Sequence, residues 1–202
     1  MDPVTLAFAV LFTAMTAVIV PVYYVQHGPA NFLWFSDIAL FGLTLALWLE
    51  SPLLASMMAV GVLIPEAVWV VSFFSGLLFG RSMSSLAGYM FDPSIPRYLR
   101  ALSLFHLALP PAMLWMLYRY GYDERALPAQ TILAWIVLPV TYWVAPAEKN
   151  VNWVRGFGHP PKSIVPANRH VLLMMVAYPV LVYLPTHWLL DALAPAAGHA
   201  AH

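Results

Sequence analysis

The chain has 202 residues, of which 62% are hydrophobic and only 9% are charged, and its formal net charge is zero. Soluble domains carry about 25% charged residues, so this composition excludes an ordinary water-soluble domain and favours a protein embedded in a lipid bilayer. The neutral charge balance gives no basis for a nucleic-acid partner, and the absence of cysteine excludes disulfides, a thiolate nucleophile and a cysteine-ligated metal site.

Six segments predict membrane-spanning helices, because a helix needs about 20 apolar residues to cross the hydrocarbon core. The first segment lacks the basic region and cleavage site of a signal peptide, so we expect it to be retained. With no internal repeat and no soluble region, the sequence predicts an all-α polytopic membrane protein: one six-helix bundle over residues 1–191 and a flexible tail over 192–202. The expected spans are 4–25, 32–49, 53–79, 98–118, 127–144 and 170–190.

The basic residues predict how this bundle is oriented. Six spans place both termini on one side, where the loops hold two arginines, Arg119 and Arg125. Seven basic residues belong to the opposite side, which is therefore cytoplasmic by the positive-inside rule. These seven are Arg81, Arg97, Arg100, Lys149, Arg155, Lys162 and Arg169.

Polar residues near the start of the second span are the first candidates for chemistry, since a charged side chain inside a bilayer is costly and usually has a partner or a function. Asp37 lies about one and a half turns into this span, directly after Ser36. Ser36 is a candidate nucleophile if a base reaches its hydroxyl, although serines in membrane helices more often bond carbonyls or neighbouring helices. Asp37 points about 100° away from Ser36 and has a structural alternative, a buried ion pair with Arg97 or Arg100.

His106 is the only histidine well inside an expected span, and an imidazole in a dry site is a plausible general base. The alternative is a structural histidine bonded to a hydroxyl or carbonyl. The second and fourth spans both begin on the cytoplasmic side, so Ser36 and His106 lie at similar depth if these spans are adjacent. Glu66, directly after Pro65 in the middle of the third span, could line a cavity, relay protons or bond across the bundle.

Other kinds of site have weaker support. Neither lysine, Lys149 nor Lys162, lies inside a span, which disfavours a retinal Schiff base. The absence of HxxxH and HExxH boxes disfavours di-iron and zinc-protease sites. We therefore expect no cofactor and no metal, with a haem or metal site at His106, His170 and a carboxylate as a remaining alternative.

The segment FDPSIPRYLRALSLFHLALPPAMLW, followed by a fifth span and NVNWVRGFG, resembles the six-helix androgen-induced-gene family. Its members are intramembrane hydrolases of fatty acid esters of hydroxy fatty acids, and their fourth-span histidine corresponds to His106. Their nucleophile is a threonine just before a second-span aspartate. The aspartate is kept as Asp37, but Trp34 stands at the threonine position, so the resemblance implies that Ser36 takes over that role.

NFLWFSDIALF and LESPLLASM are also similar to an uncharacterised family of bacterial integral membrane proteins. This resemblance implies the bacterial inner membrane, and the positive-inside rule then places both termini on the periplasmic side. Membrane lipids are the expected partners, with a membrane-protein complex as an alternative.

The preferred function is intramembrane lipid ester hydrolysis or acyl transfer. In this hypothesis Ser36 attacks, His106 acts as base and then acid, and Asp37 orients the histidine or stabilises its charge. The main alternative is a non-catalytic accessory or scaffold subunit of a larger membrane complex, in which polar residues only hold helices together. The candidate substrate contacts are Arg97, Asn152, Asn31 and Glu66.

Overall fold

The computed structural model describes residues 1–80, 83–84, 86–158 and 160–193. This part of the chain is largely helical and contains no β-strand, which confirms the all-α prediction. The α-helices are α1 (Pro3–His27), α2 (Phe35–Leu49), α3 (Pro52–Phe79), α4 (Arg97–Leu102), α5 (Phe105–Tyr120), α6 (Ala126–Val144), α7 (Ala167–Tyr178) and α8 (Leu184–Leu193). The 3₁₀ turns are η1 (Pro29–Leu33), η2 (Gly88–Phe91), η3 (Ala147–Lys149) and η4 (Val151–Trp153), and η5 (Pro179–Tyr183) is a π-helical turn.

Five helical segments of the described chain are long and apolar enough to cross a membrane: α1, α3, α4–α5, α6 and α7–α8. Each corresponds to one predicted span with similar bounds, so the prediction of a helical protein with several helices able to span a membrane is confirmed. The predicted count of six is not confirmed, because the second predicted span, residues 32–49, is too short in the structure. Its helix α2 is apolar but has 15 residues, or about 22 Å, against a hydrocarbon core of about 30 Å.

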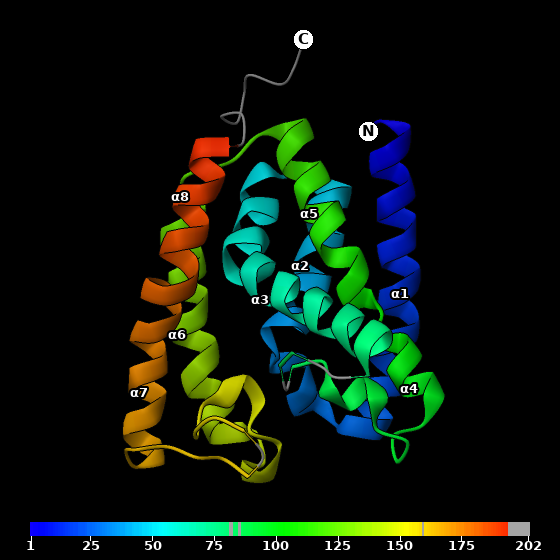
Figure 1. The fold of residues 1–202 in the computed structure, drawn as a ribbon. Helices are drawn as coiled ribbons and strands as arrows, with labels where there is room; N and C mark the ends of the chain where they lie inside the picture. The colour runs from blue at the N-terminus through cyan, green and yellow to red at the C-terminus, as the bar shows by residue number, and fades with distance from the viewer. Residues whose placement is uncertain (81–82, 85, 159, 194–202) are drawn as a thin grey trace.

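Helix α3 is the centre of the bundle and contacts α2, α5, α6 and α8. Figure 1 shows α1, α2 and α5 on one side of it and α6, α7 and α8 on the other. Pro65 lies in the middle of α3, and a proline there removes a backbone hydrogen bond and bends the helix. In Figure 1 the second half of α3 accordingly turns away from the first and runs towards α4.

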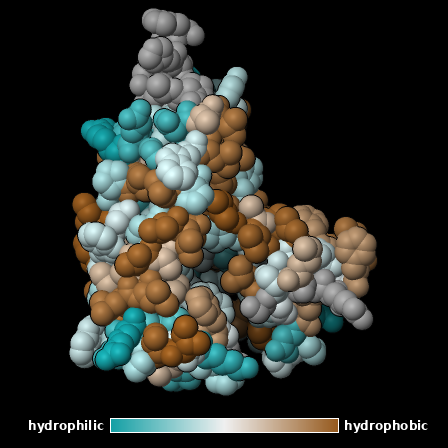
Figure 2. Space-filling model, turned by 60° about the vertical axis from the view of Figure 1, so that its left-hand side comes forward, coloured by the Kyte–Doolittle hydropathy of each residue, from teal (hydrophilic) through white to brown (hydrophobic). Residues whose placement is uncertain are grey.

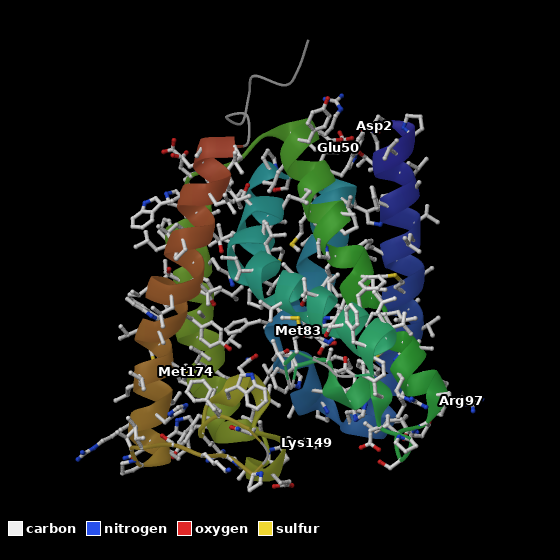
Figure 3. The ribbon with its side chains drawn as sticks, in the orientation of Figure 1. Asp2, Glu50, Met83, Arg97, Lys149 and Met174 are labelled. Atoms are coloured by element: carbon white, nitrogen blue, oxygen red, sulfur yellow. The ribbon has the colours of Figure 1, made fainter. Side chains whose placement is uncertain are left out.

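The two ends of the bundle differ in what they carry. Helix α1 begins and α8 ends at the same end (Figure 1), and Asp2 and Glu50 lie together there (Figure 3). We call this the terminal end. Arg97 and Lys149 lie at the opposite end, which we call the loop end (Figure 3). An ion pair of 3.6 Å between Arg119 Nε and Asp2 Oδ2 joins α5 to α1 at the terminal end.

Two predicted spans are interrupted near the loop end. The span predicted at 98–118 consists of α4 and α5, separated by a turn at Ser103 and Leu104. The span predicted at 170–190 changes from α7 to the π-helical turn at Pro179 and continues as α8 to Leu193. The predicted flexible tail, 192–202, lies outside the described residues from position 194 onward.

Candidate functional site

A cavity of about 450 Å³ lies between the helices towards the loop end. Its walls come from α1, η1, α2, α3, η2, α4, α5, η4 and α7, so segments from most of the chain meet there. This volume is within the range of small-molecule sites, about 300–1,000 Å³. On the flank seen in Figure 2, the surface is hollowed between the body of the molecule and a smaller lobe, with apolar side chains on both sides.

The cavity contains a histidine–carboxylate pair. His106 Nδ1 lies 2.8 Å from Glu66 Oε2, which joins α5 to the middle of α3. Glu66 is 3% exposed, and a carboxylate this deeply buried needs such a partner. Among the described residues Nε2 of His106 has no hydrogen-bond partner, and the ring lines the cavity. The carboxylate therefore fixes one ring nitrogen and leaves the other available to a ligand.

Two aromatic rings fix the plane of the imidazole. The Trp69 ring stacks on His106 with a centroid distance of 4.6 Å, and the Phe105 ring does so at 4.2 Å. Trp69 lies on α3 three residues after Glu66, so one face of this helix presents both the carboxylate and the stacking ring. The orientation of the His106 ring is therefore defined by its carboxylate and by its aromatic neighbours.

Ser36 and Asp37 reach the same cavity from the first turn of α2. No described residue is hydrogen-bonded to the Ser36 hydroxyl. The backbone N–H groups of Ser36 and Asp37 likewise donate to no carbonyl in the described chain, as is usual for the first turn of a helix. A hydroxyl and two free N–H donors thus lie together at a helix N-terminus, where partial positive charge favours a developing anion.

The Asp37 side chain is 3% exposed and has a neutral partner. Its Oδ2 accepts a hydrogen bond of 3.3 Å from Asn31 Nδ2, whereas Oδ1 is buried without a partner. The ion pair with Arg97 or Arg100 that the sequence allowed is absent among the described residues. The carboxylate bonded to His106 belongs to Glu66 and not to Asp37. From the sequence, Glu66 is assigned to the substrate contacts.

Asn152 lines the cavity, but its side-chain amide is bonded to the backbone that precedes α2. Oδ1 accepts from Phe35 N at 3.1 Å and Nδ2 donates to Leu33 O at 2.7 Å. Asn152 is 1% exposed and has a left-handed backbone with φ 51°, which asparagine tolerates better than most residues. The amide holds α2 in place, and both its polar atoms are already used.

The other predicted site residues divide between the cavity and the surface. Asn31 lines the cavity, whereas Arg97 is exposed and is not part of the lining. One turn further along α4, Arg100 lines the cavity instead. The polar and aromatic lining residues that the sequence does not assign to a site include Tyr23, Trp69, Tyr89, Arg100 and Ser103. Of these, only Ser103 has a signal in the sequence, because it lies three residues before His106.

His170 lies outside this cavity, in contact with the loop that precedes α7. Its Nδ1 lies 2.8 Å from Ser163 Oγ, and its ring packs edge-on against Phe157. The structure therefore does not bring His106 and His170 together. Within the described residues, no three histidine or carboxylate side chains are grouped closely enough to share a metal ion.

Comparisons of the chain with models of protein families, with curated proteins and with solved structures found no match. The geometry of the cavity is therefore the basis for the function proposed below.

Proposed function

We propose that this protein is an intramembrane lipid ester hydrolase or acyltransferase whose active site is the cavity around Ser36 and His106. One observation carries the proposal. A histidine with Nδ1 bonded to a buried carboxylate and Nε2 open lines the same cavity as a serine hydroxyl without a partner. A nucleophile, a base and a carboxylate that orients the base are the parts that serine-type acyl transfer requires.

In the first half of the reaction, Ser36 Oγ attacks the ester carbonyl and its proton passes to His106 Nε2. Glu66 stabilises the resulting imidazolium through Nδ1. The backbone N–H groups of Ser36 and Asp37 donate to the oxyanion of the tetrahedral intermediate. The ester C–O bond then breaks, and His106 gives the proton to the departing alcohol, which leaves an acyl group on Ser36.

In the second half, a water molecule loses a proton to His106 Nε2 and attacks the acyl carbon. The Oγ–C bond breaks and the proton returns to Ser36, which regenerates the enzyme. An alcohol in place of the water makes the same step an acyl transfer.

The surface supports entry of the substrate from the side. The hollow in Figure 2 is flanked by apolar side chains, which favour the approach of a lipid chain from the side. Pro65, Trp69 and Tyr178 give the cavity apolar and aromatic walls that suit an acyl chain.

We also propose a membrane topology for the bundle. We place α2 as a sixth, short span that begins at the cavity, because irregular backbone such as η1 is tolerated at membrane depth where it lines a cavity. If the membrane is the bacterial inner membrane that the sequence resemblance implies, the distribution of basic residues supports an orientation with the terminal end on the periplasmic side.

A fluorophosphonate lipid probe tests the proposal, because it reacts covalently with an activated serine. We expect purified protein to be labelled, and Ser36→Ala and His106→Ala each to lose labelling while keeping their thermal unfolding profile. Ser94→Ala is the matched control, since Ser94 is an exposed loop serine that does not line the cavity. Absence of labelling in folded wild type, or labelling that survives Ser36→Ala, would refute the proposal and favour the accessory-subunit alternative.

A further inference from the structure

Arg100 is a cation in the cavity with few partners of its own. Its Nη1 donates to Met90 O at 3.0 Å, while its Nε is buried and has no hydrogen-bond partner in the described chain. A guanidinium has five N–H donors, so most of its hydrogen-bonding capacity is unused by the protein. Arginine in a partly dry site normally pairs with a carboxylate or phosphate, because a desolvated unpaired charge is costly.

No described carboxylate lies within ion-pair distance of Arg100. Asp92 is near enough to interact electrostatically, but it is exposed and accepts a hydrogen bond of 2.8 Å from Ser94 N. The acidic residues of the cavity, Glu66 and Asp37, are bonded to His106 and Asn31. Arg100 therefore forms no ion pair with the described residues.

Hydroxyl groups lie beside Arg100 in this part of the cavity. Ser103 lies one turn after Arg100; its hydroxyl donates to Leu99 O at 3.3 Å, and its Oγ lies 3.1 Å from the hydroxyl of Tyr23. Tyr89 also lines the cavity and directly precedes Met90, the residue whose carbonyl holds Arg100. Arginine is over-represented where phosphate is bound, because its planar fork can donate two parallel hydrogen bonds to phosphate oxygens.

The position of Arg100 along the bundle suggests the kind of anion. Arg97, one turn earlier, is exposed at the loop end (Figure 3), so Arg100 lies just inside that end, at the level expected for lipid headgroups. His106 follows six residues later, in the first turn of α5, and this helix leads away from the loop end towards the terminal end (Figure 1). In a glycerophospholipid the acyl esters lie directly beneath the phosphate, which matches this order of groups.

We propose that Arg100 binds the phosphate of a glycerophospholipid and so places an acyl ester of that lipid at Ser36 and His106. The binding of the phosphate stands on the unpaired guanidinium alone, whereas the placement of the ester rests on the proposed function. The substrate class is therefore a phosphate-bearing lipid and not a neutral glyceride.

The test uses an ether-linked, short-chain phosphatidylglycerol with brominated chains, which the enzyme cannot hydrolyse. Binding to the detergent-solubilised protein is measured by quenching of tryptophan fluorescence, because Trp34, Trp69 and Trp153 line the cavity. We expect wild type to bind this lipid at least tenfold more tightly than the same ether-linked glyceride without phosphate. We expect Arg100→Gln to raise its Kd about tenfold or more, since hydrogen bonds to charged groups contribute about 1.5–3 kcal/mol.

Two further variants give the experiment its specificity. Arg97→Gln removes an exposed charge on the same short helix and should change Kd less than twofold. Arg100→Lys should recover part of the affinity, because lysine keeps the charge but not the planar fork. Equal loss in Arg97→Gln and Arg100→Gln would reduce the effect to general attraction at the loop end and overturn the proposal.

Three other results would also overturn it. One is equal affinity of wild type for the lipids with and without phosphate, which requires no variant to fold. The others are equally tight binding of a brominated fatty acid and displacement of the lipid by inorganic phosphate at the same concentration. Ser36→Ala should bind the ether lipid normally. If wild type binds the ether lipid but does not cleave the corresponding ester lipid, the proposed function is contradicted and the phosphate site at Arg100 stands.

Discussion

Asn152 and Phe35 are 117 residues apart in the chain and are joined by a buried hydrogen bond, in which Phe35 N donates to Asn152 Oδ1 at 3.1 Å. The other atom of the same amide, Nδ2, donates to Leu33 O at 2.7 Å. Trp34, between these two residues, packs edge-on against Trp153. The loop after α6 thus supplies the first turn of α2 with the cap that its own sequence lacks.

Replacement of Asn152 should both destabilise the protein and disturb the position of Ser36. Asn152→Ala leaves a buried N–H and a buried carbonyl unsatisfied, which costs about 1–3 kcal/mol for each group. We expect a marked drop in the thermal unfolding temperature and a loss of fluorophosphonate labelling, because Ser36 follows Phe35 directly.

Asn152→Asp and Asn152→Gly separate the contribution of the amide hydrogen bonds from that of the left-handed backbone conformation. Asn152→Asp keeps the acceptor for Phe35 N but sets a carboxylate oxygen against Leu33 O, so it should be no more stable than alanine unless the carboxyl is protonated. Asn152→Gly relieves the left-handed backbone but loses both hydrogen bonds, so it should resemble alanine if the amide is what matters. A glycine variant as stable as wild type would show that backbone conformation, and not the amide, explains the asparagine.

The pair formed by Glu66 and His106 predicts a catalytic effect without a large effect on folding. Glu66→Gln keeps the size of the side chain and an acceptor for His106 but removes the charge that stabilises an imidazolium. By analogy with serine-type triads, we expect the labelling rate to fall about 10²- to 10⁴-fold, with an unfolding temperature close to that of wild type.

Glu50→Gln is the control for this carboxylate, because Glu50 lies at the terminal end, where it accepts a hydrogen bond of 2.8 Å from the Tyr120 hydroxyl. That variant should label at the wild-type rate. A Glu66→Gln protein that labels normally would remove the carboxylate from the proposed mechanism, and one that fails to fold would give Glu66 a structural role.

Sequence reasoning placed Ser36, Asp37 and His106 at similar depth because depth depends on counting residues from a helix end, at about 1.5 Å each. The structure brings these three residues to one cavity. The sequence could not show that Glu66 is the partner of His106. That contact depends on the direction α3 takes after Pro65 and on the rotation of α3 about its axis. Neither quantity is encoded in hydrophobic periodicity.

From the sequence, Arg97 is assigned to the site, whereas Arg100 is the arginine that lines the cavity, and the reason is related. The sequence suggests one continuous span over 98–118, which begins directly after Arg97 and contains Arg100, whereas the structure interrupts it at Ser103 and Leu104. Extrapolation of a helical face from His106 back to the arginines is invalid across that turn. Asn152 was unpredictable in another way, because loop residues carry no periodic signal and its partners lie on a distant helix.

Two glycines of the bundle should respond differently to alanine. A Cβ at Gly61 would lie 2.4 Å from Gln130 Nε2, and Gln130 is 2% exposed within the packing of α3 on α6. We expect Gly61→Ala to cost about 1–3 kcal/mol through overpacking. A Cβ at Gly42 would lie 2.4 Å from Met58 Sδ, but a methionine side chain can change rotamer, and alanine is the better helix former by about 1 kcal/mol.

Thermal unfolding of both variants in one detergent tests this difference. Gly42→Ala should unfold near the wild-type temperature and Gly61→Ala clearly below it. Gly61 also lines the cavity, so its variant should label more slowly with the fluorophosphonate probe, whereas Gly42→Ala should not. A stable, normally labelled Gly61→Ala would mean that α3 and α6 approach less closely than the structure shows.

The loop between α5 and α6 should make stability depend on acid pH. Arg125 Nη2 lies 2.7 Å from Asp123 Oδ2, and hydrogen bonds from Arg125 hold the pKa of Asp123 below its usual value of 3.8, although partial burial acts in the opposite direction. A carboxyl group with a lowered pKa contributes stability that is complete above its unfolded-state pKa and is lost as the pH falls through its folded-state pKa.

Asp123→Asn removes this contribution and serves to measure it. The unfolding temperature of wild type should exceed that of Asp123→Asn by about 1–3 °C near neutral pH, which is the size expected for a pair whose arginine is largely exposed. The difference should shrink below about pH 4 and disappear once the carboxyl is protonated in both states. Because other acid-sensitive groups act equally in the two proteins, the comparison isolates Asp123. A difference that persists unchanged at low pH would mean that Asp123 acts through the size and neutral hydrogen bonds of its side chain, and not through its charge.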